Sequence, residues 1–153
     1  MIKEKETKQL IYSKILNILD NKIEILKKEI ESTKESRNND TKSSAGDKYE
    51  TGREMMQIEL DKNEAQLNKT VKLKKELTEI NIQKKYNKVE FGSLVETNKE
   101  TYFIAIGIGK IEANKNMYYS ISLASPIGKL LLSKKIGAKM KFQEREFTII
   151  NIV

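Results

Sequence analysis

The side chains that could perform chemistry here are carboxylates, lysines, tyrosines and hydroxyls, because the sequence contains no cysteine and no histidine. Without these two residue types there can be no thiolate nucleophile, no Ser-His-Asp triad and no zinc site built from thiolates or imidazoles. Any metal would have to be held through oxygen ligands, which suit Mg²⁺. The acidic residues are therefore the candidates for chemistry.

The acidic residues of most interest lie in a polar stretch, residues 34–54, which holds five acidic and five basic side chains and is locally neutral. Asp40 follows two asparagines, a combination typical of a turn. Asp47 stands just before a predicted helix, where an aspartate is a favoured cap. From the residues alone, both aspartates are thus explained by local structure.

Two long helices are predicted to position this stretch. The apolar residues of the first follow a 4-3-4-3 spacing, which places them on one stripe: Tyr12, Leu16, Leu19, Ile23, Leu26 and Ile30. Ile11, Ile15, Ile18 and Ile25 widen the stripe, as expected where the base of the helix also packs on another domain. The second helix has a weaker stripe, interrupted by Asn63 and Lys74.

Helices over residues 3–35 and 47–86, joined by one short polar connection, most economically form an antiparallel coiled-coil hairpin with its tip at about 36–48. The composition changes after residue 87, where short runs of β-branched and aromatic residues begin. Helices followed by strands indicate an α+β protein with two domains, 1–87 and 88–153.

The second domain is predicted to be a small antiparallel sheet covered by one helix. Strands are expected at 89–96, 101–107, 117–122, 138–143 and 146–152, and the strand at 101–107 should be central because it is apolar on both faces. Ser125 as N-cap and Pro126 as first helical residue predict a helix over 126–134.

The charge and hydropathy of the sequence limit the classes of protein to which the chain could belong. The 153 residues have a formal net charge of +7, spread as +4 over residues 1–88 and +3 over 89–153. This excess is compatible with a polyanionic partner, although a lysine-rich solvated surface is the more common explanation. No apolar run is long enough to span a membrane and the first residues are charged, so we expect a cytoplasmic protein.

The segment from Ile121 to Met140 resembles the C-terminal domain of the Gre transcript-cleavage factors, GreA and GreB. That family has a strand ending in Ile-Ser-x-x-Ser-Pro, a short helix and a Gly-Lys-x-x-Gly-Asp turn. The matching residues are Ile121, Ser122, Ser125, Pro126, Lys135 and Gly137, while Ser133 replaces the usual glycine and Ala138 the usual aspartate. Residues 89–95 and 147–153 look like the family's first and last strands. The resemblance implies an FKBP-like fold.

The first module is similar as well, because Gre factors carry an antiparallel helical hairpin before the FKBP-like domain. Tyr49, Arg53 and Glu54 match a Tyr-x-x-x-Arg-Glu run at the start of the family's second helix. The resemblance implies a factor that docks on bacterial RNA polymerase through Ser125, Pro126 and Ile127. Its hairpin tip, with Asp40, Asp47, Tyr49, Glu50 and Arg53, would enter the secondary channel, close to nascent RNA and DNA.

Family members use two acidic tip residues to help hold a second Mg²⁺ that activates water for RNA cleavage. Counting back from Tyr49 without gaps, these two positions fall on Lys42 and Ala45, which offer no carboxylate. Asp40 and Asp47 become metal ligands only if the loop is rebuilt. The resemblance therefore implies no catalytic residue in this chain and no stably bound cofactor; at most it would supply residues to the polymerase active site, with Mg²⁺ shared.

Two functional classes remain open. One is a Gre-like elongation factor that modulates transcription, with doubtful stimulation of cleavage. The alternative is a non-catalytic interaction module with the same fold and another partner, including a second copy of itself. We expect a monomer or weak dimer and no membrane partner.

Overall fold

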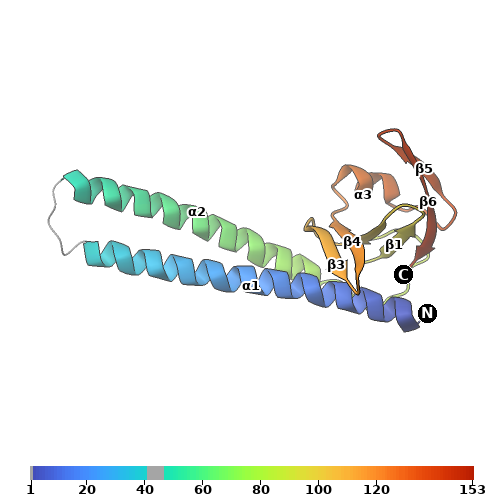
Figure 1. Cartoon of the computed structure of the whole chain (residues 1–153), viewed down its shortest axis with the longest axis horizontal. Coiled ribbons are helices and arrows are strands. Elements are labelled where there is room, and N and C mark those ends of the chain that lie inside the picture. The colour runs from blue at the N-terminus through green and yellow to red at the C-terminus, as the bar shows by residue number, and fades with distance from the viewer. Residues whose placement is uncertain (1, 41–46) are drawn as a thin grey trace. The chain divides into compact units, whose positions relative to one another are not determined.

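The computed structural model describes residues 2–40 and 47–153, and it describes only the backbone of residues 2, 40 and 47–49. Figure 1 shows two long helices followed by a sheet with one short helix. The α+β class predicted from the sequence is therefore confirmed. No helix among the described residues is long and apolar enough to cross a membrane.

The helices are α1 (Ile2–Asp40), α2 (Asp47–Thr78) and α3 (Pro126–Leu131). α1 continues five residues beyond the predicted end, and α2 ends eight residues before the predicted one. Just after α2, the backbone N–H of Gln83 donates to the side-chain Oδ1 of Asn81 at 3.0 Å. Such a turn offers the backbone an alternative to helical hydrogen bonds, and it explains why this polar stretch leaves the helix.

Contacts divide the chain into two compact units. The helical unit comprises residues 18–74, and the sheet unit comprises residues 1–17 together with 75–153. Both long helices thus contribute residues to the sheet unit. Whether residues 1–87 and 88–153 are independent folding domains stays a prediction.

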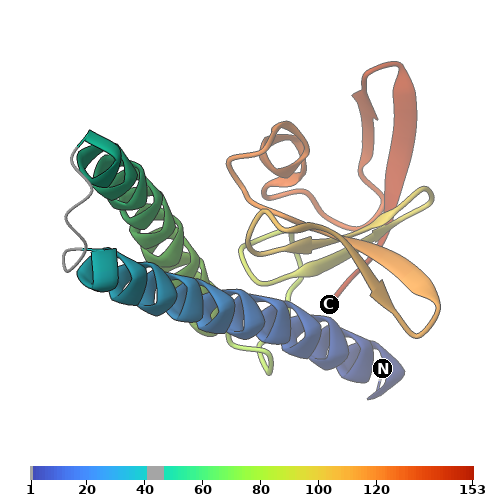
Figure 2. The ribbon, with the colours of Figure 1, turned by 60° about the vertical axis from the view of Figure 1, so that its left-hand side comes forward.

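In the helical unit, α1 and α2 run antiparallel and side by side, as Figures 1 and 2 show. Asp20 Oδ1 lies 2.7 Å from Lys74 Nζ, and Arg37 donates to Gln57 Oε1 at 2.9 Å. The residues that contact each other across the two helices are thus closer in sequence near the tip, as in an antiparallel pair. The predicted stripe is confirmed where Leu19, Leu26 and Ile30 are buried.

The predicted widening of this stripe holds only for part of α1. Ile11 and Ile15 are fully buried in the sheet unit, whereas Ile18 and Ile25 are 43% and 56% exposed in the helical unit. The expectation was wrong for the latter two because a single partner helix covers only one stripe. Asn63, which interrupts the stripe on α2, is buried, and its Nδ2 donates to no partner among the described residues.

The sheet has six strands in the order β3-β4-β2-β1-β6-β5. They are, in chain order, β1 (Leu94–Thr97), β2 (Thr101–Ile104), β3 (Gly109–Ala113), β4 (Asn116–Ile121), β5 (Lys139–Phe142) and β6 (Arg145–Ile152). β2 lies inside the sheet between β4 and β1, as predicted for a strand that is apolar on both faces.

The strand β3 was not predicted from the sequence, and one feature of the topology was missed with it. β3 pairs antiparallel with β4, and β4 then pairs parallel with β2, so the sheet is mixed rather than purely antiparallel. The reason is geometric: with β3 present the chain reverses twice between β2 and β4, and β4 then runs in the direction of β2.

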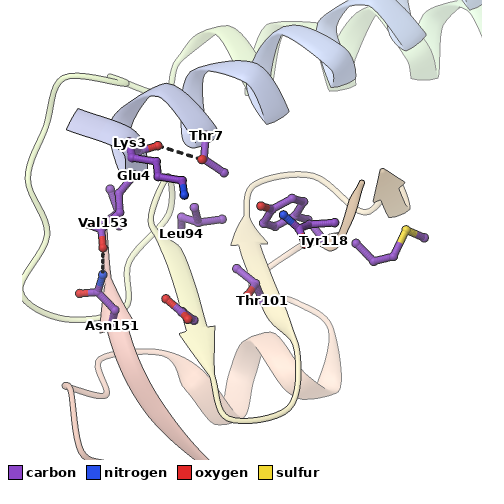
Figure 3. Close-up of a pocket in the computed structure, with 11 residues that line it drawn as sticks. Lys3, Glu4, Thr7, Leu94, Thr101, Tyr118, Asn151 and Val153 are labelled. Atoms are coloured by element: carbon purple, nitrogen blue, oxygen red, sulfur yellow. Dashed lines mark hydrogen bonds between the residues drawn. The ribbon is translucent and has the colours of Figure 1, made fainter. Parts of the chain in front are cut away.

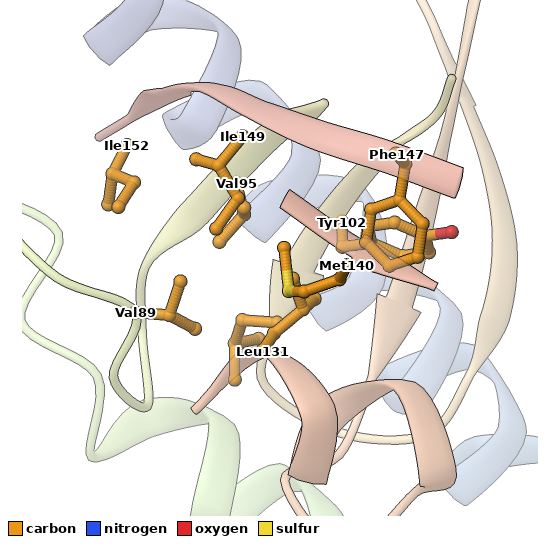
Figure 4. Packing of buried hydrophobic residues seen from close by; sticks show 9 residues of the cluster. Val89, Val95, Tyr102, Leu131, Met140, Phe147, Ile149 and Ile152 are labelled. Carbon is orange, nitrogen blue, oxygen red and sulfur yellow. The ribbon is translucent and has the colours of Figure 1, made fainter. Parts of the chain in front are cut away.

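The core of the sheet unit lies between the sheet and α3. Figure 4 shows the cluster, in which Leu131 of α3 meets strand residues from both halves of the domain. Its members are Val89, Val95, Tyr102, Ile104, Leu131, Met140, Phe147, Ile149 and Ile152. Burial of such side chains contributes about 1.5–3 kcal/mol each and holds α3 in place.

The base of α1 brings a buried charge into the sheet unit. The side chain of Lys8 is fully buried; its Nζ donates to the main-chain oxygen of Val153 at 3.1 Å and lies 4.5 Å from the centroid of the Tyr86 ring. Lys84 lies 5.0 Å from the same centroid and pairs with Glu90. Burial lowers the pKa of Lys8 from 10.5 to about 8.

This lowered pKa predicts a pH-dependent stability. Between pH 8 and 10.5 the unfolded chain binds the Lys8 proton more tightly than the native chain, so the free energy of unfolding should rise with pH across this window. Linkage limits the rise to about 1.4 kcal/mol per pH unit for one proton. Lys8→Met should abolish it, and should raise stability at pH 7 because Val153 O keeps its bond from Leu94 N.

The measurement is urea unfolding at several pH values between 7 and 10, taken as the difference between wild type and Lys8→Met. The difference removes the opposing effect of Tyr102, whose pKa is raised by burial and whose hydroxyl bonds to Glu100 rather than to Lys8. Lys5→Met, at an exposed site on α1, is the matched control. Parallel profiles for wild type and Lys8→Met would contradict the prediction.

Candidate functional site

The strongest candidate site on the sheet unit is the start of α3, where the sequence predicted a capped helix. The cap is confirmed: Ser125 Oγ accepts from Gly128 N at 3.0 Å and donates to Ser122 O at 2.7 Å. Pro126 follows as the first helical residue, where its missing N–H costs nothing. The turn that presents Ser125 and Pro126 is therefore fixed by its own hydrogen bonds.

Gly128 is a second requirement of this turn, and it was not singled out from the sequence. A Cβ at this position would overlap the carbonyl oxygen of Ser122 and press on Ser125 Oγ. Only glycine lets the first turn of α3 approach the end of β4 this closely. A glycine three residues after a serine cap was the signal available in the sequence.

The three residues predicted to dock differ in how exposed their side chains are. Pro126 is exposed and Ser125 is half-buried, and Ala124 beside them is exposed too. Ile127 is half-buried and packs against the core cluster, so its first role is to hold α3 on the sheet. Docking through these residues stays a prediction, and Pro126 offers the most accessible side chain of the three.

Ile127 also lines a small cleft with a volume of about 180 Å³. Within it, the Tyr102 hydroxyl donates to Glu100 Oε2 at 2.6 Å, and Arg145 pairs with Glu100 Oε1 at 3.1 Å. The hydrogen bond from Tyr102, followed by Arg145, lowers the pKa of Glu100, and burial raises the pKa of Tyr102. Glu100 thus stays ionised and Tyr102 protonated at neutral pH, so neither is poised to transfer a proton.

After α3, the backbone follows the turn that the resemblance to Gre factors implies. Ser133, which stands where the family has glycine, has φ +67°, and Gly137 has φ +92°. Ser133 N donates to Val89 O at 2.9 Å, and Gly137 N donates to Ile149 O at 2.8 Å. The family's glycine positions therefore both fall in the left-handed region that favours glycine.

The hairpin tip lies largely outside the described residues. Lys42 and Ala45 are not among them, and neither are the side chains of Asp40, Asp47 and Tyr49, so their roles as ligands or contacts stay predictions. The backbone places Asp40 at the end of α1 and Asp47 at the start of α2.

Two further residues predicted to lie near the tip are described. Glu50 and Arg53 have exposed side chains on α2. Among the described residues no group of three or more acidic side chains could hold a metal ion.

A polar cleft of about 490 Å³ lies in the sheet unit at the base of α1, where no site was predicted (Figure 3). Lys3, Glu4 and Thr7 line it from α1, and Leu94, Thr101 and Tyr118 line it from the sheet. Glu4 Oε1 accepts from Asn151 Nδ2 at 2.8 Å, which ties the first turn of α1 to β6. The contacts that line this cleft are those of a packed helix base.

No family model and no curated protein sequence matches the chain. One solved structure that it resembles is described as "Structure of the transcription factor Gfh1", with 19% sequence identity over 94% of this chain and 93% of that one. The TM-score is 0.34.

The conformation of Ser133 generates a stability prediction. A non-glycine residue in the left-handed region costs about 1–2 kcal/mol, and glycine recovers most of this while losing some unfolded-state entropy. Ser133→Gly should therefore raise the free energy of unfolding by about 1 kcal/mol. Ser36→Gly, the same change at an exposed position inside α1, should instead lower it by about 0.5 kcal/mol. Chemical denaturation measures the free energy of unfolding of both variants. A lower value for Ser133→Gly than for the wild type would refute the claim that Ser133 is strained.

Proposed function

We propose that this chain is a Gre-like transcription elongation factor, a cytoplasmic protein that binds bacterial RNA polymerase at the secondary channel and modulates elongation. The observation that supports this best is the agreement between motif and backbone in residues 121–137. Ser125 caps the short helix, Pro126 is exposed at its start, and both glycine positions of the family turn have positive φ. These features follow a two-helix hairpin in the order that the family has.

Within this proposal the chain contributes binding rather than catalysis of its own. The sheet unit docks through the start of α3, and the hairpin tip, carrying Tyr49, Glu50 and Arg53, enters the channel near the nascent RNA and DNA. Mg²⁺ would be held by the polymerase, with Asp40 or Asp47 adding an oxygen ligand only if the tip is rebuilt. Modulation by occupying the channel needs no ligand from this chain.

Binding is tested first with Pro126→Glu. The side chain is exposed, and glutamate is well tolerated in the first turn of a helix, so the fold should be retained. We expect the affinity for purified core RNA polymerase to fall tenfold or more, equivalent to about 1.4 kcal/mol. Surface plasmon resonance on immobilised core enzyme provides the measurement.

Met117→Glu is the matched control, because Met117 is 41% exposed on β4 of the same unit and lies outside the proposed contact. Its affinity should equal that of the wild type. An unmeasurable affinity for the wild type would refute the proposed function itself. Equal binding by all three proteins would keep the function and place the contact elsewhere.

The second test concerns RNA cleavage. Magnesium needs several oxygen ligands at about 2.1 Å, and a lysine near the metal adds repulsion where Gre factors place an acid. We therefore expect this protein to stimulate cleavage in a stalled, backtracked elongation complex weakly or not at all. The assay compares the wild type with Asp40→Asn, Asp47→Asn and a Lys42→Asp, Ala45→Glu double variant.

The double variant should gain cleavage activity, because it restores two carboxylates at the positions that the ungapped alignment assigns to the metal. Robust cleavage by the wild type that disappears in Asp40→Asn or Asp47→Asn would mean that these aspartates are the ligands after all. That result would leave polymerase binding intact and change only the tip assignment.

One observation favours the alternative of a non-catalytic interaction module. The helical unit exposes several large apolar side chains: Ile18, Ile25, Met55, Ile58 and Val71, between 43% and 68%. Apolar side chains on a long helical hairpin can pair with a second copy. Light scattering across a concentration series separates the two alternatives, since a stable dimer without polymerase affinity would favour self-association.

A further inference from the structure

The charges of the sheet unit are unevenly distributed along the chain. Residues 113–143 contain six lysines and no acidic residue, whereas the remainder of 89–153 holds all six of its acids. The six lysines are Lys115, Lys129, Lys134, Lys135, Lys139 and Lys141. α3 and the turn after it thus lie in a stretch of uniform positive charge, which includes the predicted docking residues.

Three of these lysines surround an exposed apolar pair. Every residue from Leu132 to Gly137 is exposed, with Leu132 at 44% and Ile136 at 58%. Lys134 and Lys135 lie between them, and Lys129 is exposed one turn earlier on α3. We call Lys129 and residues 132–137 the basic-apolar turn.

The lysines of this turn are available to a partner. In the part of the chain that the structure describes, neither Lys129 nor Lys134 nor Lys135 forms an ion pair. Lys141, by contrast, is 3.7 Å from Glu144. Ammonium groups without an ion pair therefore lie beside leucine and isoleucine side chains that are exposed to solvent.

The turn is also held in a defined conformation. Lys134 O accepts from Val89 N at 2.8 Å, and Ser133 N donates back to Val89 O at 2.9 Å. Ala138 N donates to Lys135 O at 3.1 Å, which closes a turn over residues 135–138 at the end of the exposed run. A surface fixed in this way loses little entropy on binding.

The chemistry of the turn selects a protein partner rather than a nucleic acid. Residues 120–141 contain no aromatic residue and no arginine, the side chains that stack on bases or read their edges. A phosphate backbone would satisfy the lysines and leave Leu132 and Ile136 in water. A protein surface with an apolar ridge flanked by carboxylates satisfies both, since interfaces combine an apolar centre with a charged rim.

We propose that the basic-apolar turn extends the docking surface at the start of α3, and that the partner surface is an acidic segment with an apolar ridge. Leu132 and Ile136 bury against the ridge, and Lys129, Lys134 and Lys135 pair with its carboxylates. This inference rests on the proposed function, because it describes the polymerase surface that the sheet unit meets.

The test compares a Lys134→Glu, Lys135→Glu double variant with a Lys99→Glu, Lys110→Glu double variant. Both change the net charge equally, and all four lysines are exposed in the same unit. The first should lower the affinity for purified core RNA polymerase tenfold or more, and the second by less than about twofold.

A third variant tests the apolar half of the turn. Leu132→Ser with Ile136→Ser should also lower the affinity tenfold or more, with little dependence on salt, because the lost contact carries no charge. Circular dichroism and thermal unfolding confirm that each variant is folded.

The possible outcomes separate the inference from the proposed function. A wild type that fails to bind polymerase refutes the proposed function, and this inference with it. If the wild type and the Lys134→Glu, Lys135→Glu variant bind polymerase equally well, the proposed function is retained and the proposed role of the basic-apolar turn is refuted. Equal losses in both charge variants mean general attraction and also refute it. A short DNA duplex is titrated in parallel; if the turn variant loses only duplex affinity, the partner is a nucleic acid and the inference fails.

Discussion

The sheet unit depends on the packing of α1 against it through Lys8, Ile11 and Ile15. These three side chains follow one another at helical spacing, and each is fully buried. The ammonium of Lys8 contacts one main-chain oxygen and one aromatic face, so its burial costs free energy that the flanking isoleucines must offset. A charge so placed tolerates only one position of the helix base, because any displacement would leave it without its partners.

The long helices and most strands could be predicted from the sequence because their signals are local. The spacing from Tyr12 to Ile30 predicts a buried stripe whatever the partner, and Ser125-Pro126 predicts a helix start from its own hydrogen bonds. β3 was missed because it begins with a glycine, is followed by Asn114 and contains only one large apolar residue, Ile111. Asn114 and Lys115, which follow β3, both have positive φ and form a tight turn. A lysine at such a position does not predict a turn of this type, which glycine usually occupies.

In the candidate site, too, the features with local causes could be predicted from the sequence, and those with tertiary causes could not. The cap at Ser125 is local and was predicted, whereas the burial of Ile127 depends on a cluster that reaches β6 and was not. Lys8 gave no signal either, since a lysine in a charged helix is ordinarily solvated. The exposure of Ile18 and Ile25 has a tertiary cause too, because the sequence alone does not state how many helices share the stripe.

In the proposed function, the sheet unit provides the binding energy and the helical unit carries the tip. The start of α3 and the turn after it belong to the sheet unit, while residues 40 and 47, at the ends of α1 and α2, belong to the helical unit. Side chains that share no partner contribute to free energies almost additively. Under the proposed function, changes at the tip should then alter the reaction in the channel without altering the affinity of docking. Under the proposed function, a chain without the acidic pair would therefore occupy the channel without supplying a metal ligand.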